Sequence, residues 1–443
     1  MQLPEYVQRC VTALEAAGFA CYAVGGCVRD ALLGLTPHDY DLCTAAKPEQ
    51  IKAVFAGESM VLAGEKHGTV GIITEKGVVE ITTFRTEGGY RDNRHPDWVE
   101  FVDDVTGDLA RRDFTVNAMA YSPIRGFADP FGGREDLKNR VLRAVGDPAE
   151  RFREDSLRIL RGVRFAVRFE LTPETETEKA MQELSFLMEN LARERIFDEL
   201  CKLLPMVNAE DLIRYAPVLT AVIPELAPMV GFDQHSPHHA YDVYTHTAHV
   251  VEGVSEELPL RWAALLHDTG KISTFKQDET GRGYFYGHAQ ESAKMADQIL
   301  RRLKAPTALR ERVTFLIDKH MVLFSPEKKT LRRQLSRWGA EPMQQLLQLQ
   351  KADFGSKGVT GETQPFDEVA QLIQQIIEEN SCLSLKDLAV NGNDLMALGI
   401  CGKQLGQTLN ELLEQVLGEA LPNEKEALLA AAKAIFCKKV GKT

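Results

Sequence analysis

The chain has 443 residues, a length that predicts about three domains. Apolar residues make up 44% and charged residues 26%, and this ordinary globular composition excludes disorder or a coiled coil as an overall description. Lys and Arg number 52 and Asp and Glu 64, so the net charge of −12 excludes a uniformly basic protein that coats nucleic acid. A local basic groove is still compatible with this charge.

No targeting or membrane segment is expected. The apolar stretch at residues 428–436 is short and contains Lys433, and residues 1–10 lack the apolar centre of a signal peptide. The eight cysteines form no CxxC pair. We therefore expect free thiols in a cytoplasmic protein, and no obligatory protein partner is evident.

Residues 1–145 are predicted to mix helices and strands. The predicted elements are a helix over 6–14, a strand over 19–24, a helix over 28–33, and strands over 40–44, 69–74, 78–84 and 98–102. After residue 146 long helices rich in Leu, Ala, Glu and Arg replace the strand pattern, with weak boundaries at 231–239 and 354–364. The predicted fold class is therefore α+β.

A pair of glycines separates the first predicted strand from the second helix. Gly25 and Gly26 would let the backbone approach a ligand closely, and the N-terminus of the following helix favours an anion. Arg29 adds a positive charge. The segment therefore indicates phosphate binding, with a plain tight turn as the alternative.

Alternating carboxylates follow. In a strand, Asp39 and Asp41 would project from one face and Tyr40 from the other. Two adjacent carboxylates need a cation, and Mg²⁺ is the ion that prefers oxygen ligands in phosphoryl-transfer sites. Glu80, inside the predicted strand over 78–84, is a candidate third ligand. The alternative for all three is a solvated strand end or edge.

The run from Arg111 to Ala120 places adjacent arginines beside an aspartate and an asparagine. The Arg112 guanidinium matches phosphate oxygens, and Asp113 can accept a hydrogen bond from a ribose hydroxyl. Asn117 belongs to the same run. Residues 129–133, Asp-Pro-Phe-Gly-Gly, form a turn that could close this domain.

These motifs, GGxVRD, DxD, RRDFTxNAMA and DPFGG, occur in an order and spacing that closely resemble the bacterial tRNA nucleotidyltransferase/poly(A) polymerase family. The resemblance covers the first half of the chain. It implies a polymerase-β-like nucleotidyltransferase head with a small mixed sheet, followed by helical domains. It also implies that Asp39 and Asp41 are catalytic and hold Mg²⁺, while the glycines, Arg29, Arg112, Asp113 and Asn117 bind the nucleotide.

Residues 153–165 are predicted to form one helix with two faces. Leu157, Leu160 and Val163 would face a core, and Asp155, Arg158 and Arg161 another side. Residues 140–168 contain eight Arg and four acids, which alone would suit a salt-bridged solvent face.

The family resemblance gives this helix a sharper role, because Glu154-Asp155-x-x-Arg158 looks like the family motif that reads the incoming base. Asp155 could accept from the amino group of cytosine or adenine while Arg158 donates to the ring nitrogen. Uracil and guanine present the reverse polarity and would be rejected. Arg161 and Arg164 are further nucleotide-binding candidates.

Residues 85–96 form a loop rich in Gly, Asp and Arg. In the family, a loop at this place separates enzymes that add the final A from those that add only CC, so its presence favours A addition. An ordinary long hairpin loop is the alternative.

Histidines and aspartates recur in helical sequence between residues 246 and 353. Imidazole and carboxylate groups suit a transition metal or Mg²⁺, although a single His on a helix is usually structural. The pattern resembles the HD phosphohydrolase superfamily, in which metal-activated water attacks a phosphate ester. The resemblance implies a divalent metal of unknown identity at His246, His267, Asp268 and Asp353, with His288 and His320 nearby for a second ion or for phosphate.

Together the motifs imply four domains: a head over 1–145, a helical neck over 146–230, an HD domain over 231–355 and a tRNA-binding tail over 356–443. The implied activity is addition of C, C and A to the tRNA 3′ end from CTP and ATP without a nucleic-acid template, with a phosphohydrolase in the HD domain. The alternatives are an A-adding enzyme or poly(A) polymerase of the same family, and an HD phosphohydrolase whose head only binds RNA.

Overall fold

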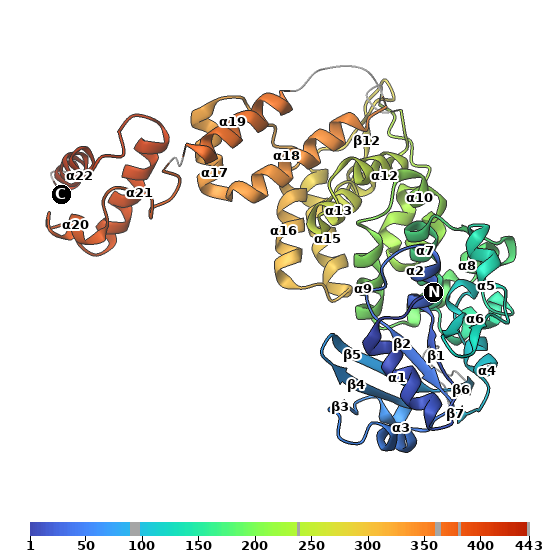
Figure 1. Ribbon diagram of the computed structural model, residues 1–443. Helices are drawn as coiled ribbons and strands as arrows, with labels where there is room; N and C mark the ends of the chain where they lie inside the picture. Colours follow the sequence, from blue (N-terminus) through green and yellow to red (C-terminus); the bar gives the residue numbers. More distant parts are fainter. Residues whose placement is uncertain (89–97, 237–239, 359–364, 380–381, 441–443) are drawn as a thin grey trace. The chain divides into compact units, whose positions relative to one another are not determined.

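The computed structural model describes residues 1–88, 98–236, 240–358, 365–379 and 382–440 (Figure 1). The chain forms two compact units, one of Met1–Ala227 with Arg302–Lys304 and one of Pro228–Arg301 with Ala305–Thr443. The boundary after Ala227 lies near the predicted end of the neck. All four predicted domain ranges remain predictions. No helix in the described ranges is long and apolar enough to cross a membrane.

A seven-stranded mixed sheet organises the N-terminal part of the first unit. Its order is β3-β4-β5-β2-β1-β8-β9, with β2 and β5 parallel and the other neighbours antiparallel. The strands are β1 (Cys21–Val24), β2 (Asp41–Thr44), β3 (Met60–Val61), β4 (Thr69–Thr74), β5 (Gly77–Thr83), β8 (Ala120–Ser122) and β9 (Gly126–Ala128). The predicted strands are therefore found within a few residues of their expected limits.

Short helices flank this sheet and its loops. They are α1 (Glu5–Ala16), α2 (Gly26–Leu32), α3 (Pro48–Val54), α4 (Val105–Ala110) and α5 (Gly133–Lys138), with 3₁₀ helices η1 (Glu65–His67) and η2 (Thr115–Asn117). Helices α1 and α3 pack on the sheet and on each other (Figure 1). Val24, Cys43, Phe84 and Leu109 belong to a buried core beneath the site described below.

A second, two-stranded ladder corrects one expectation. Strand β6 (Arg85–Gly88) pairs with β7 (Trp98–Phe101), so the first four residues of the predicted 85–96 loop are strand. Arg-Thr-Glu-Gly gives little strand signal on its own, and the cross-strand pairing supplies what local preference lacks. The rest of that loop, 89–96, lies outside the described residues.

The remainder of the first unit is helical. It contains α6 (Pro148–Glu154), α7 (Leu157–Phe169), α8 (Thr175–Glu183), α9 (Arg193–Leu203), α10 (Ala209–Arg214) and α11 (Ala216–Val222), with η3 (Ser185–Asn190), η4 (Pro224–Met229) and the short parallel pair β10 (Val141–Leu142) and β11 (Thr172–Pro173). Helix α7 packs against α9 and buries Leu157, Leu160 and Val163 as predicted.

The prediction of one helix over residues 153–165 is wrong. The chain breaks at Asp155, whose backbone is extended at φ −141° and ψ 100°, so Glu154 ends α6 and Leu157 begins α7. The Asp155 carboxylate accepts a hydrogen bond from the Leu157 N–H at 3.2 Å. Asp side chains compete in this way with the helical ladder, and the break turns Asp155 out of the register of Arg158.

The second unit is almost entirely helical. Its helices are α12 (Val243–Gly253), α13 (Leu258–Leu266), α14 (Lys271–Thr274), α15 (His288–Arg302), α16 (Thr307–Lys319), α17 (Lys328–Trp338), α18 (Ala340–Gly355), α19 (Phe366–Glu378), α20 (Gly392–Met396), α21 (Lys403–Leu417) and α22 (Lys425–Val440), with one short hairpin, β12 (Lys276–Gln277) and β13 (Gly283–Tyr284). Helix α13, with the fully buried Trp262, packs against α12, α16 and α18. A separate core near the C-terminus includes Leu395, Leu412 and Leu428.

Candidate functional site

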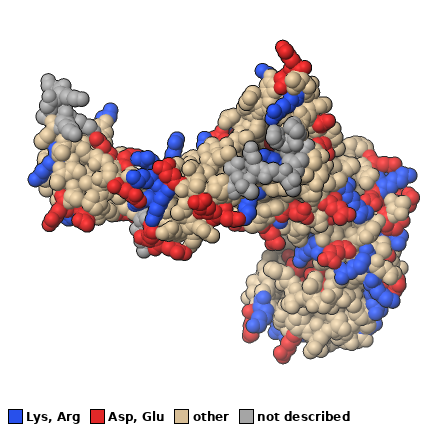
Figure 2. Space-filling view, turned by 90° about the horizontal axis from the view of Figure 1, so that it is seen from above, with Lys and Arg blue, Asp and Glu red and all other residues tan. Residues whose placement is uncertain are grey.

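A cavity of about 410 Å³ in the first unit lies where the sheet meets α7 and α9. We call it the arginine cavity. Eight arginines and three aspartates line it, together with two glycines, Asn117, Leu157 and Phe165; the charged residues are Arg29, Asp41, Arg111, Arg112, Asp113, Asp155, Arg158, Arg161, Arg164, Arg168 and Arg195. This excess of positive charge suits a polyphosphate. It is local, because Figure 2 shows acidic and basic side chains interspersed over the visible surface.

The structure brings together every predicted nucleotide-binding residue in this cavity. Gly25, Gly26, Arg29, Arg112, Asp113, Asn117, Asp155, Arg158, Arg161 and Arg164 all line it. Of the three predicted metal ligands, Asp41 lines the cavity, whereas Asp39 and Glu80 are not among its lining residues.

The carboxylates of Asp41 and Glu80 lie on adjacent parallel strands. The two residues are direct partners in the β2–β5 register, so they occupy the same face of the sheet, and both are exposed. Asp39 precedes β2 and does not share the strand with Asp41, contrary to expectation. Partial desolvation, then the charges of Asp39 and Glu80, raise the pKa of Asp41 to about 6. A cation among these oxygens would relieve that repulsion, so the donor set fits Mg²⁺.

A chain of buried polar side chains joins α2, η2 and α7. Arg29 donates to Asn117 and Asp30, Asn117 donates to Asp113 at 3.0 Å, and Arg161 donates to Asp113 through two N–H groups at 2.7 and 2.9 Å. Burial opposes ionisation of Asp113, but the Arg161 charge and these bonds hold its pKa at about 2. Asp113 is therefore ionised and holds the Asn117 and Arg161 side chains in place.

The Gly25 turn and Arg112 are fitted to each other. Gly25 has a φ of +77°, and a Cβ built there would lie 2.7 Å from Nη1 of Arg112. The buried Nε of Arg112 has no hydrogen-bond partner in the described structure. An unsatisfied guanidinium N–H beside a glycine turn is the arrangement that an anionic ligand would complete.

The two predicted base-reading residues line the same cavity without pairing to each other. Arg158 donates to the Glu154 carboxylate at 2.8 Å and to the Arg111 carbonyl at 2.9 Å. Asp155 instead pairs with Arg195 of α9. Arg164 is tied to the buried Glu199 at 2.6 Å.

A second constellation lies in the second unit. We call it the histidine–aspartate cluster: His246, His267, Asp268, His288, His320 and Asp353. The structure brings all six predicted residues together. Ligand atoms of His246, His267 and Asp268 lie within 4.8 Å of one another, as do those of Asp268, His288 and His320, so Asp268 belongs to both groups. The Nε2 of His246 lies 2.9 Å from Asp353 Oδ1.

Each histidine of the cluster is oriented by a backbone carbonyl. The Nδ1 atoms lie 2.6 to 3.1 Å from the carbonyl oxygens of Ser356, Ala264, Phe285 and Ile317. These bonds place the ring proton on Nδ1 and leave a lone pair on Nε2. The arrangement is typical of metal-ligating histidines, whose second nitrogen is held by the protein.

The inward-facing atoms of the cluster are acceptors that face one another. Nε2 of His288 lies 3.2 Å from Nε2 of His320, and Nε2 of His267 lies 3.1 Å from Asp268 Oδ2. In the described structure His267 Nε2 is buried without a hydrogen-bond partner, while Asp268 Oδ2 also faces the Lys271 ammonium. Burial lowers the pKa of His320 to about 4, so this imidazole is neutral. The cluster fits one or two divalent cations.

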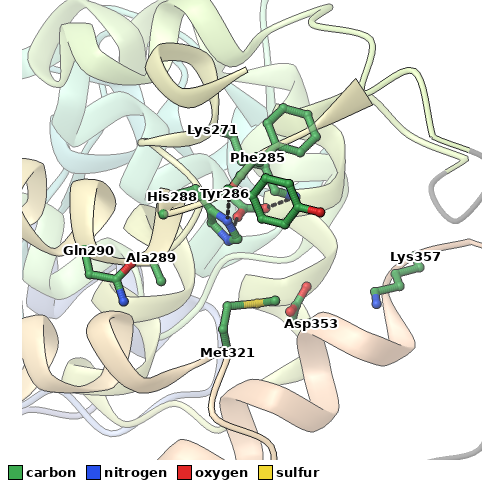
Figure 3. Close-up of a pocket in the computed structure, with 11 residues that line it drawn as sticks. Lys271, Phe285, Tyr286, His288, Ala289, Gln290, Met321, Asp353 and Lys357 are labelled. Carbon is green, nitrogen blue, oxygen red and sulfur yellow. Dashed lines mark hydrogen bonds and ion pairs between the residues drawn. The ribbon is translucent and has the colours of Figure 1, made fainter. Parts of the chain in front are cut away.

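A cavity of about 350 Å³ opens onto the cluster (Figure 3). Asp268, His288 and Asp353 line it, with Lys271 and Lys357 as cations and Phe285 and Tyr286 as aromatic walls. Lys271 Nζ forms an ion pair with Asp268 Oδ2 at 2.7 Å and donates to Gln234 Oε1 at 2.8 Å. The cavity therefore joins a cation-binding cluster to positive charges that suit an anion.

Sequence reasoning missed several residues at both sites. Arg195 and Arg168 line the arginine cavity, and Lys271 contacts Asp268. The signal for Lys271 was its place three residues after Asp268. Arg195 stands in an ordinary charged run, and only the packing of α9 against α7 gives it a role.

Comparison with known proteins identifies the family. The model "Poly A polymerase head domain" matches residues 21–143, "Probable RNA and SrmB- binding site of polymerase A" matches 168–229, and "tRNA nucleotidyltransferase domain 2" matches 278–432. The CCA-adding enzyme of Levilactobacillus brevis is 35% identical over 431 residues, covering 94% of each chain. That of Streptococcus thermophilus is 32% identical, covering 98% of each. The chain belongs to the CCA-adding enzyme family.

The structure agrees with this assignment. A CCA-adding enzyme from Bacillus stearothermophilus, solved in complex with CTP, superimposes with a TM-score of 0.73 at 26% identity over 100% of both chains. The predicted polymerase-β-like head with its small mixed sheet and following helical domains is confirmed. CCA-adding enzymes are nucleotidyltransferases, so the predicted enzyme class is confirmed as well.

Proposed function

We propose that this chain adds C, C and A to the 3′ end of tRNA, using CTP and ATP. The observation that carries the proposal is the arginine cavity, in which a glycine turn, Asp41 and the Asp155/Arg158 pair meet in a chain of the CCA-adding family. The CTP complex of the Bacillus stearothermophilus relative supports the choice of nucleotide. The reaction is attack of the tRNA 3′-hydroxyl on the α-phosphate, which releases pyrophosphate.

We assign Mg²⁺ to Asp41, with Asp39 and Glu80 as the further candidate ligands. When bound, the ion would lower the pKa of the 3′-hydroxyl and neutralise charge on the leaving pyrophosphate. Around it the protein positions the triphosphate. Arg112 offers its unpaired N–H beside Gly25 and Gly26, while Arg161 and Arg164 add positive charge on α7.

The role of Asp113 is revised from the sequence expectation. A carboxylate has about four acceptor sites. Those of Asp113 accept from Phe114 N–H, Asn117 and two N–H groups of Arg161. A ribose hydroxyl would have to displace one of them. We therefore assign to Asp113 the positioning of Arg161 and Asn117, and leave nucleotide contact to those neighbours and Arg112.

Arg158 can read the base edge while it remains anchored. Its contacts with Glu154, the Arg151 carbonyl and the Arg111 carbonyl use three N–H groups. A guanidinium has five, so within the described residues two remain for the ring nitrogen of cytosine or adenine. Asp155 accepts from the amino group beside it. With uracil or guanine, the ring N–H would face the N–H groups of Arg158 and the carbonyl oxygen would face the Asp155 carboxylate, so both contacts would be repulsive.

The test is incubation of the protein with tRNA transcripts that end in the discriminator base, in C and in CC, with each NTP offered separately. Incorporation of C on the first two and A on the third is expected. Addition of A alone, or of long A tracts, would instead support the A-adding enzyme or the poly(A) polymerase. Asp41→Asn should abolish addition and leave the fold intact, and normal turnover of this variant would contradict the metal assignment.

We further propose that residues 231–355 form an HD domain whose histidine–aspartate cluster hydrolyses a phosphate ester. The facing acceptors of His267, Asp268, His288 and His320 support a bound divalent metal there. A bound metal would supply an activated water. Lys271 holds Asp268, and Lys357 lies across the cavity beside Asp353 in reach of an anionic substrate (Figure 3). The domain limits 1–145, 146–230 and 356–443 belong to the same proposal, with the last segment holding the tRNA body.

A 2′,3′-cyclic phosphate offered with Mg²⁺, Mn²⁺, Co²⁺ or Ni²⁺ tests this second activity. We expect the wild type to hydrolyse the cyclic phosphate and the His267→Gln variant to lose this activity. Absence of hydrolysis with every ion would overturn it. A protein that hydrolyses the ester and adds no nucleotide would instead support the alternative of a phosphohydrolase with an RNA-binding head.

A further inference from the structure

Helix α9 carries two side chains of opposite charge that pair with residues lining the arginine cavity. Arg195 and Glu199 are four residues apart and so share one helix face. Arg195 reaches Asp155, and Glu199 reaches Arg164 on α7. Glu199 and Arg164 are both buried. Asp155 at the break and Arg164 of α7 are thus each held from α9 by a counter-charge.

The contact between Arg195 and Asp155 is bidentate. Nη1 lies 3.3 Å from Oδ1 and Nη2 lies 2.8 Å from Oδ2, and both side chains are largely covered, with 25% and 19% exposure. Two parallel N–H···O bonds fix the plane of a carboxylate as well as its position. This matters because Asp155 sits at a helix break, where the backbone alone does not fix the side chain.

These contacts also restrict what Asp155 can still accept. Oδ1 accepts from Leu157 N–H and Arg195, and Oδ2 accepts from Arg195. Of about four acceptor sites, one is left on Oδ2 in the described structure. A single remaining acceptor matches one exocyclic amino N–H of cytosine or adenine.

We propose that Arg195 is a positioning residue that enforces base selection, by holding the Asp155 carboxylate in one orientation with one open acceptor. The inference rests on the proposed function, in which Asp155 reads the amino group. Without Arg195, Asp155 would rotate about its side-chain torsions. It could then turn away from the carbonyl of a wrong base, so selectivity would fall more than overall binding.

The experiment compares Arg195→Gln and Arg195→Lys with the wild type in single-nucleotide addition. Kcat/KM is measured for CTP against UTP on a transcript ending in the discriminator base, and for ATP against GTP on one ending in CC. Arg195→Gln should lower both ratios about tenfold or more. In this variant Asp155 can move away, so UTP and GTP no longer bring a carbonyl oxygen against a fixed carboxylate. Arg195→Lys keeps the positive charge but loses the bidentate contact, so its ratios should lie between those of the wild type and those of Arg195→Gln.

A matched control comes from the same helix. Arg193 contacts the backbone carbonyl of Glu189, so Arg193→Gln should leave the ratios unchanged. Equilibrium binding of CTP and UTP without tRNA gives a readout separate from turnover. In Arg195→Gln the difference in affinity between CTP and UTP should become smaller than in the wild type. In an Asp155→Asn background, Arg195→Gln should change the ratios less than about twofold, because the two residues act through one contact.

Three results separate the outcomes. If Arg195→Gln lowers kcat/KM for all four nucleotides equally, Arg195 is structural and the inference is wrong. If the wild type selects CTP and ATP, and Asp155→Asn loses selection while Arg195→Gln keeps it, the inference fails and the proposed function stands. If the wild type does not select, the proposed function itself fails.

Discussion

The charged residues of the arginine cavity differ in the hydrogen-bonding groups that they can offer to a ligand. In some of them, contacts within the protein already use these groups. Asp113 is saturated by four donors. In the described structure Arg112 and Arg158 keep N–H groups that no protein acceptor uses. The free donors therefore mark ligand contacts, and the saturated groups hold them in place.

Asp113 should make stability depend on pH. Its folded pKa of about 2 lies below the ordinary 3.8, so the ionised pair with Arg161 stabilises the fold above pH 4 and loses that effect as pH falls towards 2. Asp113→Asn should lower the free energy of unfolding by about 2 kcal/mol at pH 7 and by roughly half of that at pH 3. Urea unfolding at both pH values measures the difference.

The control for this titration is Asp198→Asn on the exposed side of α9, which should change stability little at either pH. An Asp113→Asn effect of the same size at pH 7 and pH 3 would contradict the linkage, since an uncharged packing defect does not titrate.

Arg158→Ala should relax nucleotide choice more than it weakens tRNA binding. The change removes the donors to the ring nitrogen, a contact that discriminates between bases, and leaves the phosphate-binding arginines in place. Misincorporation of UTP and GTP should rise about tenfold or more relative to CTP and ATP. Unchanged preference, measured with each NTP on the same transcript, would show that the base is read elsewhere.

Among the elements, the sequence predicted those whose signal is local. Strands β1, β2, β4 and β5 carry β-branched or alternating residues between glycines, and all lie close to their predicted limits. The break at Asp155 was missed because the Arg/Leu pattern runs through it without interruption. Strand β6 was missed because its pairing with β7 comes from across the loop. The conspicuous motifs contain most residues that line the arginine cavity, although Asp39 does not line it, whereas Arg195 required knowing that α9 packs on α7.

The turn at residues 129–133 shows how one element supports another. Both carboxylate oxygens of Asp129 accept backbone N–H groups, from Gly133 at 2.7 Å and Arg134 at 3.0 Å, at the start of α5. A Cβ at Gly133 would lie 2.1 Å from the Thr115 carbonyl oxygen. Helix α5 can therefore approach η2, which carries Asn117, only because residue 133 lacks a side chain.

Gly133→Ala should destabilise the first unit by about 1–3 kcal/mol, because the obstacle is backbone and one element must move. Displacement of η2 should also weaken CTP binding through Asn117. Gly107→Ala, inside α4, is the matched control. Its Cβ would meet only methyl groups of Thr86 and Val102 at 3.3 Å, which can shift. Thermal unfolding measures the stability of both variants, and CTP titration measures their nucleotide affinity. Equal stability of the two variants would contradict this packing argument.

At the scale of the whole chain, the two candidate sites belong to different compact units, each with its own core. The arginine cavity draws on residues between Gly25 and Arg195, and the histidine–aspartate cluster on residues between His246 and Asp353. No residue of the described structure lines both cavities. Each site should therefore bind its own ion and lose function separately.

A crossed pair of substitutions tests this independence. His267→Gln removes a ligand of the histidine–aspartate cluster, so it should abolish phosphate-ester hydrolysis and the rise in melting temperature that Mn²⁺ or Ni²⁺ gives the wild type. It should keep nucleotide addition within about twofold, because sites that share no residues or partners behave additively. Asp41→Asn should do the opposite. If His267→Gln stopped addition of CTP while the first unit still bound that nucleotide, the two sites would be coupled. A tRNA end that carries a phosphate lacks the hydroxyl that attacks the nucleotide, so separate sites would let one chain restore that hydroxyl before extending it.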